Sequence, residues 1–267
     1  MEDVFDSDLA TRSKAAYCEA LSCFANHAGY DGQIVSALMQ THNAFKHEAK
    51  SDVRRKEVKL AAQPLDLVGI AETAHVLLHK APTQDHIRVR RRDYILAASM
   101  ALLTKLPLRK SDVQNARVGR ELCRNSEGWT VSLNTSKTGA DITRRLADEL
   151  TPYLDAVLLM GVGACHLWTV YQDRVGTALL GNPAQSWKPF GKNWLLENMQ
   201  AVTGHGPHVV RSLIYDAIVA DPSLDLKVAQ ALCGHAHETS RKFYELNADR
   251  YRRAQASERL SEIAAAS

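Results

Sequence analysis

The pattern of hydrophobic and polar positions along the chain predicts a mainly helical protein. Apolar residues recur at helical spacing from Ala10 to Ala25, from Asp31 to Ala49 and from Leu65 to His79. The segment from Asp93 to Lys105 is apolar nearly all round, which is typical of a helix buried inside a domain. We therefore expect a central core helix at 93–105 with amphipathic helices packed around it.

One segment has the periodicity of a strand instead. From Trp129 to Thr135, apolar and polar residues alternate with a period of two. The next five residues, Ser136 to Ala140, include a glycine and predict a turn, after which Asp141 to Leu146 returns as a second strand. The expected fold class is therefore mainly α with a small antiparallel β-hairpin or sheet.

Further along the chain, the spacing predicts helices from about Asp148 to Met160 and from Asn193 to Val202, separated by a loop from Gly176 to Gly191. The main boundary is predicted at Gln63-Pro64, because the residue before a proline avoids the helical region. We expect a helical N-terminal segment at 1–62 and the main domain at 63–267.

Composition excludes several classes of protein. No stretch approaches the roughly 20 apolar residues that a membrane span needs. The N-terminus is acidic, where a signal peptide would be basic, so we expect a cytoplasmic protein. The five cysteines are scattered without a CxxC pair, which predicts neither a disulfide framework nor a zinc site.

The net charge of +3 says little about partners, whereas the clustering of basic residues says more. Two basic runs are candidates for contacting DNA phosphates. They comprise Arg54, Arg55, Lys56, Arg90, Arg91 and Arg92. A solvated helix face is an equally good interpretation of either run.

A helix predicted from His208 to Ala220, opened by Pro207, carries a polar strip. At about 100° per residue, Arg211, Ser212 and Tyr215 fall within roughly 60° of His208. A histidine and an arginine one turn apart can grip an anion together. Taken alone, however, this His-x-x-Arg pattern is more often a solvated helix face.

The segment from Leu232 to Tyr244 favours the anion-binding interpretation of this helix over the solvated face. It resembles the Leu-Gly-His motif of the tyrosine recombinases, the phage-type integrases, in which a tyrosine follows the histidine by nine residues, as Tyr244 follows His235. The family's catalytic set occurs in a fixed chain order, and each of its positions has a match here. The matching residues are Arg109, Lys137, His208, Arg211, His235 and Tyr244.

Two of these matches lie in local motifs. Leu106 to Asp112 resembles the family's Thr-Gly-Leu-Arg-x-x-Glu box, with Asp112 in the acidic position, where it is expected to orient Arg109. Lys137 lies in the turn of the predicted hairpin, as in the family. The sequence departs from the pattern at Pro107 and Cys233, neither of which removes a catalytic group. The resemblance covers about residues 64 to 250, and the N-terminal segment is shorter than the family's DNA-clamping domain.

The resemblance implies a site-specific recombinase that cuts DNA without a metal or cofactor. Tyr244 would attack the scissile phosphorus and form a 3′-phosphotyrosyl bond, while Arg109 and Arg211 pair with the phosphoryl oxygens. Lys137 would act as the general acid for the 5′-oxygen. His235 would add a hydrogen bond, and His208 would assist proton transfer at the tyrosine.

The resemblance also implies double-stranded DNA as the partner and association with the nucleoid. Assembly as a homo-tetramer on DNA would use a C-terminal helix at Ala254 to Ala266. Whether accessory DNA-bending proteins take part is left open. Three alternatives stay open as well: a type IB topoisomerase, a catalytically silent DNA-binding protein of the same fold, and a metal-dependent nuclease.

Overall fold

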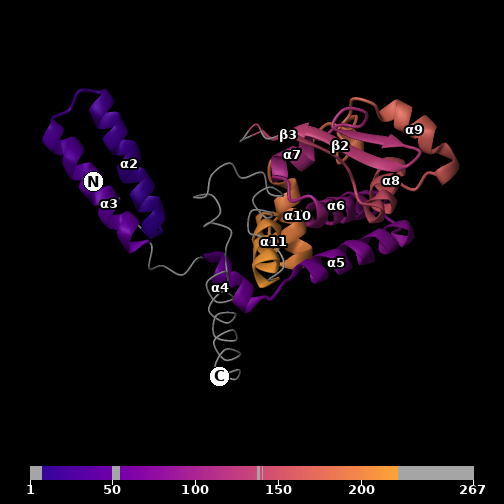
Figure 1. Cartoon of the computed structure of the whole chain (residues 1–267), viewed down its shortest axis with the longest axis horizontal. Coiled ribbons are helices and arrows are strands. Elements are labelled where there is room, and N and C mark those ends of the chain that lie inside the picture. Colours follow the sequence, from indigo (N-terminus) through magenta and orange to yellow (C-terminus); the bar gives the residue numbers. More distant parts are fainter. Residues whose placement is uncertain (1–7, 50–54, 137–138, 140, 222–267) are drawn as a thin grey trace, which may run out of the picture. The chain divides into compact units, whose positions relative to one another are not determined.

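The chain divides into two compact units, Met1–Ala62 and Gln63–Ser267. The computed structural model describes residues 8–49, 55–136, 139 and 141–221 (Figure 1). Each unit is described by itself below. Of the residues and segments predicted to matter, Lys137, His235, Tyr244, Arg54 and the C-terminal helix at 254–266 lie outside the described residues.

The first unit contains a helical hairpin and a short third helix. Its elements are α2 (Thr11–His27), α3 (Gly32–Glu48) and α4 (Arg55–Ala62). Gly29, at a φ of 74°, turns the chain between the first two, and the Asp31 side chain caps α3 by accepting from the amide of Gln33 at 2.8 Å. Small buried residues such as Ala15 and Cys18 allow α2 and α3 to pack closely.

The second unit is built around α6 (Ile87–Lys105), as the hydrophobic pattern predicts. Every residue from Asp93 to Leu103 is buried, and α5 (Leu67–Lys80) and α8 (Thr151–Leu159) pack against this helix. The helix begins six residues before the predicted start, because the imidazole of His86 accepts from the amide of Arg88 at 3.2 Å and caps it.

The remaining helices in the described part of the second unit are shorter than α6. They are α7 (Lys110–Asn115), α9 (Leu167–Arg174), α10 (Trp194–Thr203) and α11 (His208–Ala220), with 3-10 turns at η1 (Ala81–Thr83), η2 (Asp148–Leu150), η3 (Ala164–His166) and η4 (Pro183–Gln185). Both α10 and α11 pack against α5 and α6. Within the part of the chain that the structure describes, no single helix is long and apolar enough to cross a membrane, although one bent pair meets the criteria jointly.

The described part of this unit also contains a three-stranded antiparallel sheet, in the order β1 (Leu122–Asn125), β2 (Gly128–Asn134) and β3 (Asp141–Arg145). The predicted hairpin is therefore confirmed as β2 and β3, in a register that pairs Val131 with Arg144. The first strand was not predicted, because its four residues are too few to show a period.

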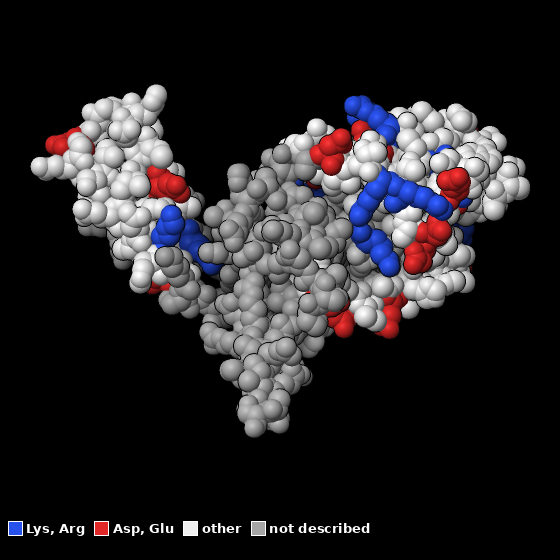
Figure 2. Space-filling view, in the orientation of Figure 1, with Lys and Arg blue, Asp and Glu red and all other residues white. Residues whose placement is uncertain are grey.

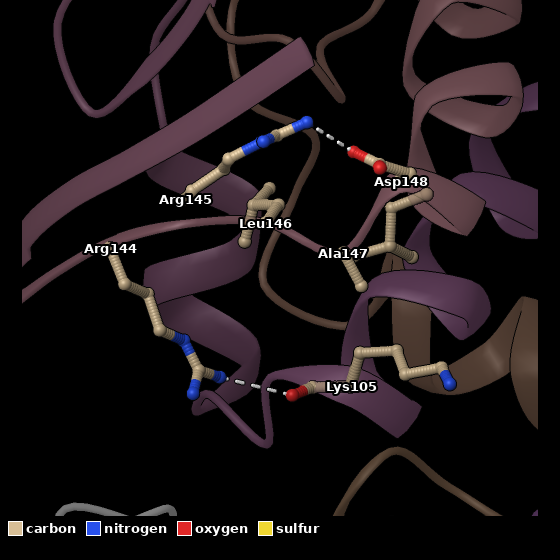
Figure 3. Close-up of a pocket in the computed structure, with 7 residues that line it drawn as sticks. Lys105, Arg144, Arg145, Leu146, Ala147 and Asp148 are labelled. Carbon is tan, nitrogen blue, oxygen red and sulfur yellow. Dashed lines mark hydrogen bonds and ion pairs between the residues drawn. The ribbon is translucent and has the colours of Figure 1, made fainter. Parts of the chain in front are cut away.

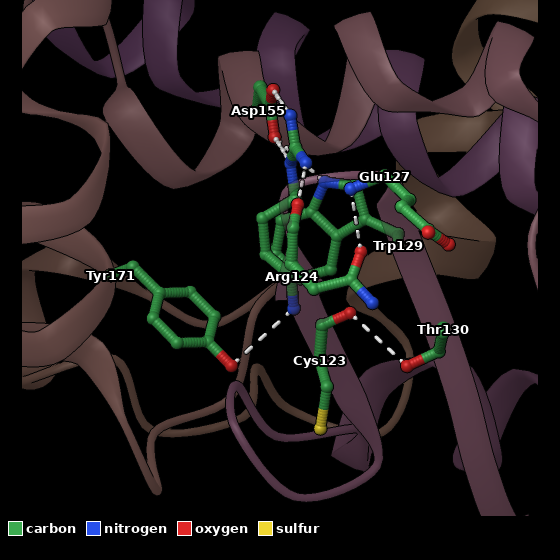
Figure 4. A network of polar contacts seen from close by, with 8 residues as sticks. Cys123, Arg124, Glu127, Trp129, Thr130, Asp155 and Tyr171 are labelled. Atoms are coloured by element: carbon green, nitrogen blue, oxygen red, sulfur yellow. Dashed lines mark hydrogen bonds and ion pairs between the residues drawn. The ribbon is translucent and has the colours of Figure 1, made fainter.

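Asp155 of α8 anchors the sheet to the helices (Figure 4). Its carboxylate accepts a hydrogen bond from the indole N–H of Trp129 at 2.7 Å and forms an ion pair with Arg124 at 3.1 Å. The hydroxyl of Tyr171, from α9, accepts from the amide of Arg124 at 3.4 Å. A partly buried charged group with several partners fixes orientation as well as position, so β1 and β2 are held firmly against α8.

Candidate active site

Three of the four residues in the polar strip of α11 are buried in the second unit. Arg211 and Ser212 are each 1% exposed and Tyr215 is fully buried, as are Val209, Val210 and Ile214 on the opposite side of the helix. The solvated-face interpretation of the His-x-x-Arg pattern is therefore wrong for Arg211, whereas His208 is exposed. A buried guanidinium needs acceptors or anions around it, so this burial is the first sign that the strip has a special role.

Arg109 reaches the site from the end of α6. Leu106 and Leu108 are buried side chains that anchor the linking segment, and Arg109 itself has extended backbone angles at the N-cap position of α7. Arg109 and the adjacent Lys110 are both half-buried. The chain is therefore fixed on both sides of Arg109 by packed elements.

The electrostatics of His208 link these two segments. Although part of His208 is exposed, desolvation lowers the pKa of its imidazole, and the positive charges of Arg211, Lys110 and Arg109 lower this pKa further. Charges must lie close to act in this way. Three predicted site residues, Arg109, His208 and Arg211, thus share one positively charged region.

Asp112 does not orient Arg109 as expected. Its Oδ1 atom accepts from the backbone amide of Ser136 at 3.2 Å, and no ion pair joins it to Arg109. Among the described residues, its buried Oδ2 atom has no hydrogen-bond partner. The carboxylate therefore holds the start of the β2–β3 turn, one residue before Lys137.

Lys110 was not singled out from the sequence, although it adjoins Arg109. Its ammonium donates to the carbonyl of Lys192, and Gln114 donates to the carbonyl of Gly191 at 3.4 Å. These bonds tie α7 to the segment before α10. The only signal in the sequence was the basic pair Arg109-Lys110, which by itself is typical of a solvated surface.

The side chains of the two basic runs, which were candidates for contacting DNA phosphates, differ in what they bind. Arg90 donates twice to the carbonyl of Gln84, and Arg92 forms an ion pair with Asp93 at 2.7 Å, so both side chains bind within the unit. Arg91 is half-buried, as is Lys56. Arg55 begins α4, and its side chain is outside the described part.

Comparison of the sequence with models of protein families gives no match, and comparison with curated proteins gives none either. Among the residues described, no group of three or more His, Cys, Asp or Glu side chains is arranged to hold a metal ion.

We expect Lys110→Gln to raise the pKa of His208 toward its ordinary value of 6.5, because one of the charges that repel its proton is removed. An NMR titration of the imidazole protons measures this. Since the pKa is lower in the folded chain than in the unfolded one, the contribution of His208 to stability should fall as the pH drops below about 6.5, and less so in the variant.

Lys80→Gln is the matched control, because Lys80 is exposed and is not among the charges that act on His208. An unchanged His208 pKa in Lys110→Gln would contradict the proximity of Lys110 to the imidazole.

Proposed function

We propose that this protein is a site-specific DNA recombinase of the tyrosine recombinase class, which cuts and rejoins DNA through a 3′-phosphotyrosyl intermediate. The observation that carries the proposal is the convergence of Arg109, His208 and the buried Arg211, which are far apart in the sequence. Two guanidinium groups beside a histidine are the donors that a phosphodiester needs when charge builds on its oxygens.

In the proposed reaction, the Tyr244 oxygen forms a bond to the scissile phosphorus while the bond to the 5′-oxygen breaks. The tyrosine proton passes toward His208, whose lowered pKa keeps the imidazole neutral and able to accept it near pH 7. Lys137 gives a proton to the departing 5′-oxygen. Because the phosphodiester is exchanged rather than hydrolysed, a 5′-hydroxyl of another strand can reverse the step without ATP.

The link from Asp112 to Ser136 supports a role for Lys137 in this scheme. It ties the start of the lysine-bearing turn to α7, the helix that follows Arg109. The general acid and the first arginine would then be positioned by one short helix.

The test is to trap the covalent intermediate. Fragmented, nicked DNA from the source genome is incubated with the protein in the presence of a chelator, the protein is denatured, and the attached DNA is sequenced. We expect adducts at a discrete site with the parent chain and none with Tyr244→Phe, which should still bind DNA.

Undiminished adducts in Tyr244→Phe would refute Tyr244 as the nucleophile. DNA binding without any adduct in the parent would favour a silent DNA-binding protein. Once a site is known, joining of two duplexes separates a recombinase from a topoisomerase, which relaxes supercoils instead.

A further inference from the structure

A pocket of about 430 Å³ opens between the end of α6 and the end of β3 (Figure 3). The pocket is distinct from the residues matched to the catalytic set. It is lined by Lys105, Arg144, Arg145, Leu146, Ala147, Asp148 and Leu150. Three of the seven lining residues are basic and one is acidic, so the lining carries a net positive charge.

The three basic side chains differ in what they already bind. Arg145 forms an ion pair with Asp148 at 2.7 Å and donates to the carbonyl of Glu127 at 2.7 Å, so its charge is balanced. Arg144 donates one hydrogen bond, at 3.0 Å, to the carbonyl of Lys105, which is a neutral acceptor. Two positive charges, those of Arg144 and Lys105, are therefore left without a counterion in the described part of the chain.

The hydrogen bond from Arg144 also gives the pocket a fixed geometry. The acceptor is one of the last carbonyls of α6, which have no partner within the helix. Arg144 caps the helix end and is thereby held beside Lys105, with further guanidinium N–H groups available to a ligand. The Lys105 side chain points away from this guanidinium (Figure 3), so Arg144 supplies the fixed donors and Lys105 adds positive charge to the same lining. A held guanidinium in a positively charged pocket suits an anion with several oxygen atoms, such as a phosphate.

The pocket is connected to the candidate active site by short, packed segments. Lys105 precedes Arg109 by one buried stretch, Leu106 to Leu108. Arg144 lies on β3, which pairs with β2 on the far side of the turn that carries Lys137. Figure 2 shows Lys and Arg side chains gathered on this unit with acidic side chains next to them, so positive charge is local and not spread over the whole face.

We propose that this pocket binds a phosphate of the DNA backbone that flanks the phosphate being cut. The inference rests on the proposed function, which supplies the DNA. A free phosphate compound has the same chemistry as a ligand, and the experiment separates the two sources.

The experiment compares duplex DNA binding across a range of salt concentrations. The parent for this comparison is the full chain with Tyr244→Phe, so that no cleavage interferes. In the double variant Lys105→Gln with Arg144→Gln, the slope of log affinity against log salt should become shallower by about 1, the change for one lost phosphate contact. The control, Lys80→Gln with Lys188→Gln, removes the same charge from two other exposed positions and should keep the slope of the parent.

An unchanged slope in the pocket variant, or an equal change in the control, overturns the assignment. Inorganic pyrophosphate is the probe for the other source. If it raises the melting temperature of the parent but not of the pocket variant, while the salt slopes agree, the ligand is a free phosphate compound and the DNA assignment is wrong. A shallower slope in the pocket variant, without any covalent adduct in the wild-type chain, would support phosphate binding by the pocket and refute the proposed recombinase function. Covalent adducts in the wild-type chain, with an unchanged slope in the pocket variant, would support the recombinase function and refute the assignment of the pocket.

Discussion

We expect Arg211→Lys to slow formation of the covalent DNA adduct by about 10² to 10³. The substitution keeps the positive charge but removes the planar fork of N–H donors that matches two phosphoryl oxygens. Arg211 is only 1% exposed, so water cannot replace the missing donors. Single-turnover measurement of adduct formation on a nicked duplex with Tyr244 intact gives the rate directly.

Ser212→Ala is the matched control for this prediction. Ser212 is the next residue of α11 and equally buried, so its substitution perturbs the same turn without removing a charged donor. We expect its adduct rate to stay within a few-fold of the parent. If Arg211→Lys also reacts at the parental rate, Arg211 does not contact the reacting phosphate. Thermal unfolding of both variants separates a lost contact from a lost fold.

The elements that could be predicted from the sequence are those long enough to show a period. The core helix α6, the hairpin of β2 and β3, and α11 all follow from apolar spacing, and α11 has the predicted bounds. Shorter elements could not be predicted in this way. Strand β1 exists because it pairs with β2, and α7 has only six residues, so neighbours rather than local pattern determine both.

The residues of the candidate site could also be predicted only in part. Motif spacing selected Arg109, His208 and Arg211, but it could not show that Arg211 is buried, since burial depends on how the rest of the chain packs around α11. The hydrogen-bond partner of Asp112 also could not be predicted from the sequence. The resemblance suggested Arg109, whereas the amide of Ser136 comes within 3.2 Å only when α7 and the β2–β3 turn are packed together.

Arg174 is the clearest case of a residue whose role the sequence conceals. Its guanidinium donates to the carbonyls of Val157 and Leu158 in α8, and to those of Ala178 and Leu179 in the following loop, at 2.8 to 3.3 Å. It also lies over the ring of Trp187, 3.4 Å from the centroid. In the sequence it is indistinguishable from a solvated arginine at the end of a helix.

This clamp holds a loop that leads to the candidate active site. Trp187 has a φ of 61°, an unfavourable value for a residue with a side chain, so the stacked guanidinium offsets local strain. Gly181 is required nearby, because a Cβ atom there would lie 2.3 Å from the carbonyl oxygen of Trp187. The same loop continues to Gly191 and Lys192, whose carbonyls accept from α7.

We expect Arg174→Met to lower the free energy of unfolding by about 3 kcal/mol. Four carbonyls lose a donor in a buried site, which costs roughly 1–3 kcal/mol each when no water replaces it, and relief from burying a charge offsets part of that loss. Burial is what lowers the pKa of Arg174 to about 9, so the side chain is still charged at pH 7. Urea denaturation measures the change.

The control is Arg120→Met, which breaks a largely exposed ion pair with Glu121 and should cost less than about 1 kcal/mol. Equal stability of the two variants would mean that the carbonyls find other donors and that Arg174 does not hold the loop.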